Sequence, residues 1–368
     1  MKKIGLVSGP TAFMILLYFP PSGLTEEATG VLASTAWVAI WWMTEAISIY
    51  AAALLPLLLF SITGAVPIKL AAQSYGHPFI FLFLGGFIIA RAIERWGLHK
   101  RIALNIINFM GTDLNKIVLG FMVATAFLSM WISNTATSVM MLPIGLAVVN
   151  QIHASARVNF GKALVISIAY SASIGGVATL IGTPPNLVMA GVLKEFFGYN
   201  ITFQEWLIIG LPFSVTMLFI CWVYLTRMAF PMQNLTMEGG KKVIHEELTL
   251  LGKITYEEKV VAIIFGLAGF CWVSQSFLLK PFIPTLDDSL IAIFFALLFF
   301  IIPRKSRSAT ILKWNEAVTL PWGVLLLYGG GLSIADSFQT SGLAEWIGTQ
   351  LSGLRGLDVL IVLIVVVT

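Results

Sequence analysis

Two short polar motifs interrupt apolar stretches of this chain, and both carry groups that bind ions. The first is Ser133-Asn134-Thr135, with Ser129 one helical turn before it. The second is Gly182-Thr183-Pro184-Pro185-Asn186. Hydroxyl, amide and carbonyl oxygens are neutral ligands that a hard monovalent cation such as Na⁺ accepts in place of water. The two motifs therefore indicate a site for an alkali cation.

The second motif predicts a break in a membrane helix. Pro184 and Pro185 lack the N–H that a continuing helix needs, and Gly182 permits backbone angles that other residues avoid. The break frees backbone carbonyls before it, at residues 180–182, and N–H groups at the start of the next helix. At membrane depth such groups are tolerated only where they line a cavity or bind something.

The first motif predicts the start of another helix. Asn134 and Thr135 are suitable N-caps for a helix from Ala136 onward, and Ser129 and Ser133 are spaced to share one helix face. Helix N-termini carry partial positive charge and favour anions, so the two breaks together suit a cation beside an anion. The alternative is that these small polar residues only mediate helix contacts.

The composition places these motifs in a membrane. Of the 368 residues, 58% are hydrophobic and 11% are charged, whereas a soluble protein has about 25% charged residues. This composition excludes a soluble enzyme, a nucleic-acid-binding protein and a disordered scaffold. The two cysteines, Cys221 and Cys271, both lie in apolar stretches and give no disulfide framework. We expect an all-α polytopic membrane protein.

The pattern of apolar runs and basic residues predicts the topology. Lys and Arg concentrate on the cytoplasmic side of membrane proteins, which here places the N-terminus and a polar loop at 232–257 inside. The segment 102–162 must then enter and leave on one side, so 117–132 and 136–150 form a re-entrant hairpin with Ser133-Asn134-Thr135 at its tip. About nine spans are expected: an N-terminal run ending near Pro20, and runs near 30–43, 46–63, 78–95, 163–181, 206–228, 258–279, 287–302 and 320–338.

An internal repeat relates two parts of the chain. Residues 85–113 align without gaps on 330–358, with 9 identities in 29 positions, among them Gly97 on Gly342. The topology gives the two copies opposite orientations, which is typical of inverted-repeat transporters. An amphipathic interfacial helix at 94–108 then has its counterpart at 340–352. The same shift places the partner of Ser133 about ten residues beyond Thr368, so the sequence is expected to be truncated inside a second hairpin.

Together these motifs resemble the divalent anion:sodium symporter family, which carries dicarboxylates, citrate or sulfate. The resemblance rests on the Ser-Asn-Thr tip, the Gly-Thr-Pro-Pro-Asn break, Thr44-Glu45-Ala46 after a tryptophan pair, and Tyr328-Gly329-Gly330-Gly331. It extends from about Trp41 to the end of the chain.

The resemblance implies residue roles and a domain organisation. Sodium would be held by Ser129, Ser133, Asn134 and the backbone at Gly182, and the anion by Asn134, Thr135, Thr183 and Pro184. The protein would be a homodimer in which a transport domain slides against a scaffold in an elevator-type movement. The divisions are 1–108 (scaffold spans and interfacial helix), 109–231 (transport part), 232–352 (cytoplasmic loop, second-repeat scaffold spans and interfacial helix) and 353–368 (start of a second, truncated hairpin). The family's second Ser-Asn-Thr is absent from this sequence.

We therefore predict sodium-coupled transport of a small dianion, such as succinate, across a bacterial inner membrane. The alternatives are an exchanger or a proton-coupled carrier of related fold, a membrane-embedded enzyme, and a channel. Proton coupling would use an intramembrane carboxylate, and the candidates are Glu45, Glu94, Glu316 and Asp336. No nucleophile elbow, metalloprotease motif or paired intramembrane Asp supports an enzyme.

Overall fold

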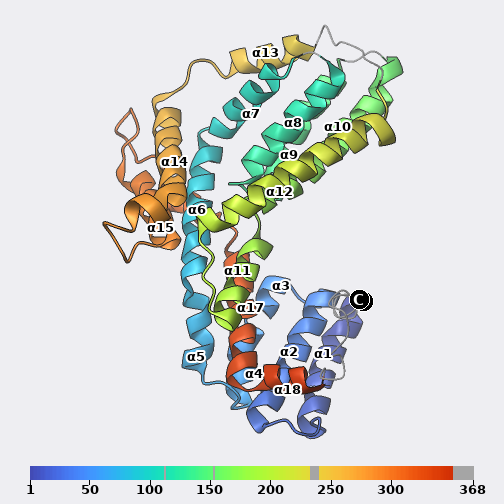
Figure 1. Cartoon of the computed structure of the whole chain (residues 1–368), viewed down its shortest axis with the longest axis vertical. Helices are drawn as coiled ribbons and strands as arrows, with labels where there is room; N and C mark the ends of the chain where they lie inside the picture. Colours follow the sequence, from blue (N-terminus) through green and yellow to red (C-terminus); the bar gives the residue numbers. More distant parts are fainter. Residues whose placement is uncertain (112, 152–153, 233–239, 351–368) are drawn as a thin grey trace. The chain divides into compact units, whose positions relative to one another are not determined.

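The computed structural model of the chain describes residues 1–111, 113–151, 154–232 and 240–350, which form helices and no β-strand (Figure 1). By length and composition, four helices of these described ranges are able to cross a membrane, and they are accompanied by shorter apolar helices. The four are Ile68–Arg95, Arg157–Val177, Phe203–Ala229 and Tyr256–Leu279. An all-helical chain with several apolar helices agrees with a polytopic membrane protein, while the number of spans stays a prediction.

The helices belong to two compact units, which we call unit 1 and unit 2. Unit 1 takes its residues from Met1–Ile80, Gly191–Tyr199 and Trp322–Thr368, and unit 2 from Phe81–Ala190 and Asn200–Pro321. Two helices, α6 (Pro78–Arg95) and α11 (Pro184–Phe197), contribute residues to both units.

Unit 1 is built around α17, which packs against α2, α3, α4, α5 and η1. The expected span at 46–63 contains two short helices, which a turn at Ala53 and Leu54 separates. The Tyr75 hydroxyl donates a hydrogen bond to the Ala53 carbonyl, which draws that carbonyl out of a continuous helix. The helices of unit 1 are α1 (Lys2–Tyr18), α2 (Glu26–Thr44), α3 (Ile49–Ala52), α4 (Leu55–Ile62), α5 (Ile68–Gln73), η1 (Ser74–Gly76), α17 (Trp322–Thr340) and α18 (Leu343–Gln350).

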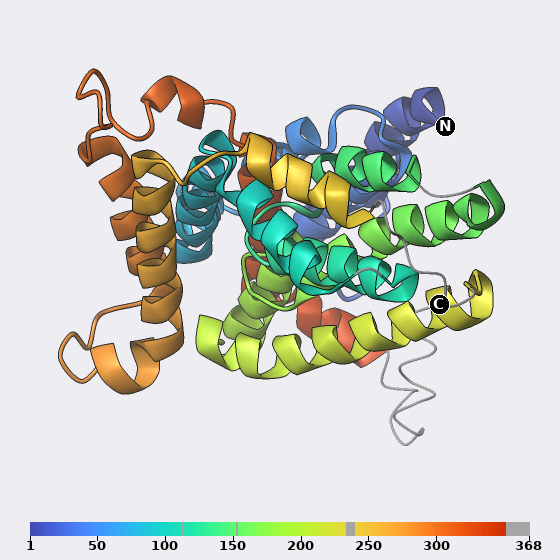
Figure 2. The ribbon, with the colours of Figure 1, turned by 90° about the horizontal axis from the view of Figure 1, so that it is seen from above.

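Unit 2 has its core between α7, α8, α9, α10 and α12, and Figures 1 and 2 show the last four side by side. Ile117, Phe121, Met141 and Leu164 are fully buried there. The helices of unit 2 are α7 (Leu98–Phe109), α8 (Leu114–Ser129), α9 (Asn134–Val149), α10 (Ala154–Val177), α12 (Phe203–Val223), η2 (Tyr224–Ala229), α13 (Gly240–Leu250), α14 (Tyr256–Ser274), η3 (Gln275–Leu279), α15 (Asp288–Ile301) and α16 (Trp314–Ala317).

Local sequence explains where several of these helices begin. Thr202 and Glu205 form a reciprocal capping box at the start of α12, and Thr255 and Glu258 do the same for α14. The Asp113 carboxylate accepts hydrogen bonds from two N–H groups of the first turn of α8. Each cap satisfies N–H groups that the helix itself leaves unpaired.

The polar segment 232–257 is not only a loop. It contains α13, which packs against α7 and buries Ile244 in the core of unit 2. Residues 233–239 of this segment lie outside the described ranges. The few apolar residues of α13 were too sparse for the sequence to predict a helix, and the contact with α7 supplies the missing apolar environment.

Ion pairs involve three of the four carboxylates considered for proton coupling, and the exposed pair of Lys2 Nζ with Glu45 Oε2, at 3.8 Å, is the longest. Arg95 Nε lies 2.6 Å from Glu316 Oε1, and Arg91 Nη1 lies 3.3 Å from Glu94 Oε2. Burial raises the pKa of Glu316, but hydrogen bonds from the Lys313 N–H and the Arg95 guanidinium outweigh this, so the pKa lies below its ordinary value. The two shorter contacts give Glu94 and Glu316 a structural role.

The two copies of the sequence repeat have matching helix boundaries. Shifted by the repeat distance, α6 and α7 coincide with α17 and with the described part of α18. The turn between the helices is made by Gly97 (φ 71°) in one copy and by Gly342 (φ 77°) in the other. This left-handed backbone favours glycine. Residues 351–368, where the second hairpin was expected to start, lie outside the described ranges.

Candidate functional site

The first polar motif lies where the chain leaves α8 and starts α9. The helix α8 ends at Ser129 and α9 begins at Asn134, with four residues between them. Ser133, and not Asn134 or Thr135, is the N-cap, because its hydroxyl oxygen accepts a hydrogen bond of 3.3 Å from the Ala136 N–H. The expectation that Ser129 and Ser133 share a helix face is also wrong, since the helix ends between them; Ser129 is buried and Ser133 is exposed.

The Ser129 hydroxyl oxygen lies close to two other oxygen atoms at this break. Its hydroxyl lies 2.6 Å from Asn134 Oδ1 and 2.6 Å from the carbonyl oxygen of Ala172 in α10. A hydroxyl has one proton to donate, so three close oxygens share a single hydrogen. These oxygens have more lone pairs than there are hydrogen-bond donors to fill them. A bound cation would take up the remaining lone pairs.

The second polar motif lies where the chain leaves α10 and starts α11. As expected, α11 begins at Pro184, but α10 ends at Val177, earlier than the predicted break. The buried Asn186 amide donates hydrogen bonds to the carbonyls of Gly176 (2.9 Å) and Thr179 (2.7 Å). Asn186 therefore satisfies carbonyls that the interrupted helix leaves free.

The two breaks meet at Gly176. A Cβ atom at Gly176 would lie 2.5 Å from Asn134 Oδ1, and a Cβ at Gly182 would lie 2.5 Å from the Gly176 carbonyl oxygen. The Thr179 hydroxyl also donates to the Met130 carbonyl in the first break. Residues far apart in sequence thus form one polar cluster within unit 2, which we call the Gly176 cluster.

The predicted site residues fall into two groups. Ser129, Asn134 and Gly182 all belong to the Gly176 cluster. Ser133, Thr135, Thr183 and Pro184 are exposed or half-buried and flank it in the chain. The Ser133 oxygen is occupied by its helix-capping bond. The structure therefore brings three of the four predicted sodium ligands together and leaves the fourth at the edge.

The sequence analysis missed two contributions to the cluster. Asn186 was noted only as a residue of a helix start, whereas its amide joins both sides of the break. Gly175 and Gly176 were not singled out, although the backbone of α8 and the side chain of Asn134 lie directly against them. The adjacent glycines near the end of a long apolar helix were the available signal.

Replacing Asn186 with leucine is expected to destabilise the protein. The leucine would fill a similar volume but would leave two buried carbonyls unpaired, at a cost of about 1–3 kcal/mol for each unsatisfied group. The check is the thermal unfolding midpoint of the purified protein in detergent. The exposed Asn159 is the matched control, and equal midpoints for Asn186→Leu and Asn159→Leu would contradict this role.

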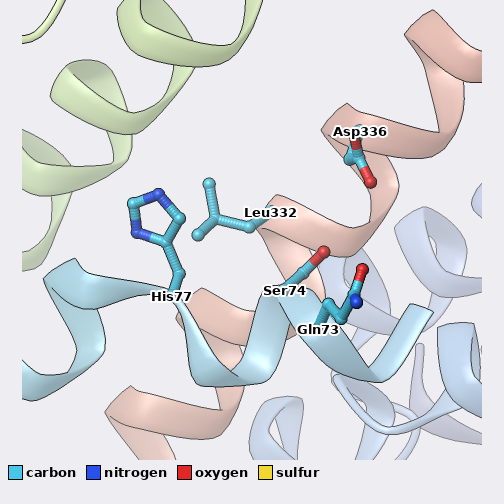
Figure 3. Close-up of a pocket in the computed structure, with 5 residues that line it drawn as sticks. All are labelled: Gln73, Ser74, His77, Leu332 and Asp336. Atoms are coloured by element: carbon cyan, nitrogen blue, oxygen red, sulfur yellow. The ribbon is translucent and has the colours of Figure 1, made fainter. Parts of the chain in front are cut away.

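A polar cavity of about 160 Å³ lies in unit 1 (Figure 3). Gln73, Ser74 and His77 line it from the segment before α6, and Leu332 and Asp336 line it from α17. The Asp336 carboxylate would repel a dianion, so this cavity does not fit such a solute. The described ranges hold no cluster of three or more His, Cys, Asp or Glu able to bind a metal ion.

The chemistry of the Gly176 cluster suits a monovalent cation beside an anion. Its ligands are neutral oxygens from Ser129, Asn134 and backbone carbonyls. The first turns of α9 and α11 both contact Gly176, through Asn134 and Asn186, so two helix N-termini with partial positive charge begin at the cluster.

Known proteins resemble this chain over almost its whole length. The family described as the sodium:sulfate symporter transmembrane region matches residues 4–368. A protein named sodium-dependent dicarboxylate transporter SdcS from Staphylococcus saprophyticus is 45% identical over 378 residues, which cover 99% of this chain and 73% of the relative. The protein of the same name from Staphylococcus aureus strain USA300 is 46% identical over 376 residues, covering 99% and 72%.

Proposed function

Because this chain belongs to the sodium:sulfate symporter family, we propose that it is a sodium-coupled secondary carrier of a small divalent anion, with a C4-dicarboxylate such as succinate as its cargo. Na⁺ is the coupling ion. The observation that carries the proposal is the Gly176 cluster, where two interrupted helices present neutral oxygens and two helix N-termini at one place. Relatives of 45% and 46% identity named as sodium-dependent dicarboxylate transporters support the choice of ion and cargo.

The sodium ligands in this proposal are Ser129, Asn134 and the backbone at Gly182, with Ser133 at the edge of the site. These oxygen ligands fit Na⁺, because the Ser129 hydroxyl has one proton for the two oxygens close to it, Asn134 Oδ1 and the Ala172 carbonyl. Neutral ligands bind an alkali ion weakly enough to release it, and a carrier has to release its coupling ion on the far side of the membrane.

The anion would contact Asn134, Thr135, Thr183 and Pro184. Thr135 is exposed, and Thr183 and Pro184 are half-buried, so a solute can reach them while Ser129 stays covered. A partly buried helix N-terminus contributes at most about 2 kcal/mol toward an anion. Two such termini hold a dianion poorly, and the positive charge of Na⁺ adds the missing attraction. Ion and cargo therefore bind together.

The transport movement would follow the domain organisation implied by the family resemblance. We propose an elevator-type movement in a homodimer, with 109–231 in the moving part and 1–108 and 232–352 in the scaffold, apart from its cytoplasmic loop. Inverted orientation of the two repeat copies is part of this proposal. The matching boundaries of α6–α7 and α17–α18, with glycine at each turn, support the repeat itself.

The topology proposed is a multi-pass protein of a bacterial inner membrane with a cytoplasmic N-terminus. The membrane potential then favours uptake, since each surplus positive charge moving inward gains about 2.3 kcal/mol per 100 mV. Cargo that enters with excess Na⁺ can accumulate against its own gradient.

Uptake of radiolabelled succinate into proteoliposomes tests the function. We expect an inward Na⁺ gradient to drive uptake, and choline in place of Na⁺ to abolish it. Uptake driven by internal unlabelled succinate without Na⁺ would instead indicate an exchanger, and uptake driven by a proton gradient alone a proton-coupled carrier. Either result would contradict sodium coupling.

A further inference from the structure

An aromatic stack lies behind the loop that leads into the Gly176 cluster. Trp131 is in the break between α8 and α9, two residues after Ser129 and three before Asn134. Its ring stacks on Phe203 at 6.0 Å between ring centroids and on Trp272 at 6.2 Å. Phe203 and Trp272 stack on each other at 5.1 Å. We call these three rings the Trp131 stack.

The stack joins three separate elements of unit 2. Phe203 is the first residue of α12, and Trp272 belongs to α14. Phe203 and Trp272 are fully buried. Phe265 of α14 adds an edge-on contact to the Trp131 ring at 4.9 Å. Aromatic pairs in such geometries stabilise one another beyond what their buried area contributes. Packing against α12 and α14 therefore sets the position of the Trp131 ring.

Asp288 fixes both rings that hold Trp131. It is buried at the start of α15, and its Oδ2 accepts a hydrogen bond of 2.7 Å from the Phe203 N–H. Its backbone carbonyl accepts a bond of 3.1 Å from Trp272 Nε1. A single residue of α15 thus holds one ring by its side chain and the other by its main chain.

Backbone hydrogen bonds from the N–H groups of Trp131 and Ile132 to the Leu128 carbonyl also tie the loop between α8 and α9 to the end of α8, and the Ile132 side chain is buried. The Met130 carbonyl accepts a hydrogen bond from the Thr179 hydroxyl, and the buried Trp131 Nε1 has no hydrogen-bonding partner among the residues that the structure describes. The Trp131 ring is therefore held by stacking and not by a polar contact. Because Ser129 and Asn134 lie at the two ends of this loop, a shift of Trp131 changes the spacing of their oxygens.

We propose that Trp131 is a positioning residue for the sodium-binding oxygens of Ser129 and Asn134, held in place by Phe203, Trp272 and Asp288. The inference rests on the proposed function, since it assigns the stack to the sodium site. Residues that orient the ligands of a bound ion affect its affinity without touching it. The assignment extends the site to α12, α14 and α15, none of which supplies an ion ligand. Because α14 and α15 belong to the proposed scaffold, the stack positions the ligands in the arrangement of moving part and scaffold in which Trp131 contacts them.

The test is the half-saturating Na⁺ concentration of the purified full chain, obtained by fitting the rise of its thermal unfolding midpoint with Na⁺ concentration, with choline keeping the ionic strength constant. An ion that binds only the native state raises the unfolding midpoint. We expect Trp131→Ala and Phe203→Leu to raise the half-saturating Na⁺ concentration about tenfold, as loss of a ligand-orienting partner does. Trp131→Phe keeps a ring and should stay near the wild-type value.

Two further variants separate positioning from general destabilisation. Asp288→Asn keeps an acceptor for the Phe203 N–H and should retain the wild-type half-saturating concentration, whereas Asp288→Ala should raise it. Phe299→Ala removes a fully buried ring from the far end of α15, and should lower the unfolding midpoint without changing the Na⁺ response. If Trp131→Ala fails to fold, the Phe203→Leu and Asp288 results decide.

The outcomes distinguish failure of the positioning role from failure of the proposed sodium site. Variants of the stack that lower the midpoint as Phe299→Ala does, with an unchanged half-saturating concentration, would overturn the positioning role and leave the sodium site intact. A wild-type protein with no Na⁺-dependent stabilisation would contradict the sodium site itself, and the positioning role would fall with it.

Discussion

Replacing Asn134 with alanine is expected to abolish sodium-dependent succinate binding. Asn134 Oδ1 lies 2.6 Å from the Ser129 hydroxyl and directly against Gly176, and in the proposed function it serves both the ion and the anion. Affinity should fall at least about 100-fold, because losing even an outer partner of an ion ligand costs about 10- to 100-fold. The measurement is binding of radiolabelled succinate to purified protein over a range of Na⁺ concentrations.

Asn105→Ala is the matched control for this result. Asn105 is exposed on α7 and donates only to a carbonyl of its own helix, that of Arg101, so its removal should leave succinate binding unchanged. Sodium-dependent binding that survives in Asn134→Ala would show that the ion and the anion bind elsewhere. Ser129→Ala should weaken binding in the same direction, since it removes the hydroxyl at the centre of the three oxygens.

Replacing Gly175 with alanine is expected to destabilise the protein strongly. A Cβ atom at Gly175 would lie 2.2 Å from the carbonyl oxygen and 2.4 Å from the Cα of Ala126 in α8. Both contacts are with backbone, so no side-chain rotation can relieve them. We expect a loss of about 3 kcal/mol, at the upper end of overpacking effects, read as a lower thermal unfolding midpoint in detergent.

Gly266→Ala provides the opposite case in the same unit. Gly266 is exposed within α14, and a Cβ atom there would meet nothing within 4 Å. Alanine at a helical position of this kind should stabilise by about 0.5–1 kcal/mol, because glycine costs more conformational entropy on folding. A Gly175→Ala protein as stable as Gly266→Ala would mean that α8 and α10 do not approach as closely as described.

The family resemblance drawn from the two motifs is confirmed by the match over residues 4–368, and its site residues were partly placed by local rules. The start of α11 at Pro184 follows from the proline ring and its missing N–H, whereas the cap of α9 is Ser133 and not the predicted Asn134 or Thr135. The exact helix ends were less predictable. The helix α10 ends at Val177 and not near 181, because Asn186 supplies replacement donors for its freed carbonyls.

Contacts between distant segments could not be predicted from the sequence. The hydrogen bond from Ser129 to the Ala172 carbonyl, the pairing of Arg95 with Glu316, and the stack of Trp131 on Phe203 each join residues tens to hundreds of positions apart. Each residue type has several possible partners in an apolar chain, and pattern alone does not choose among them.

The sequence by itself determined the membrane environment, the all-helical class, the two regions where helices are interrupted, and the neutral character of the polar groups there. These follow from properties of single residues and their immediate neighbours: hydropathy, the proline ring and the helix-capping hydroxyl. The tertiary structure decided that both breaks meet at Gly176, that Ser133 lies at the edge of the cluster as a helix cap, and that an aromatic stack contacts the loop between α8 and α9. Such choices depend on close approach of whole helices, which is set by the shape of both surfaces at once.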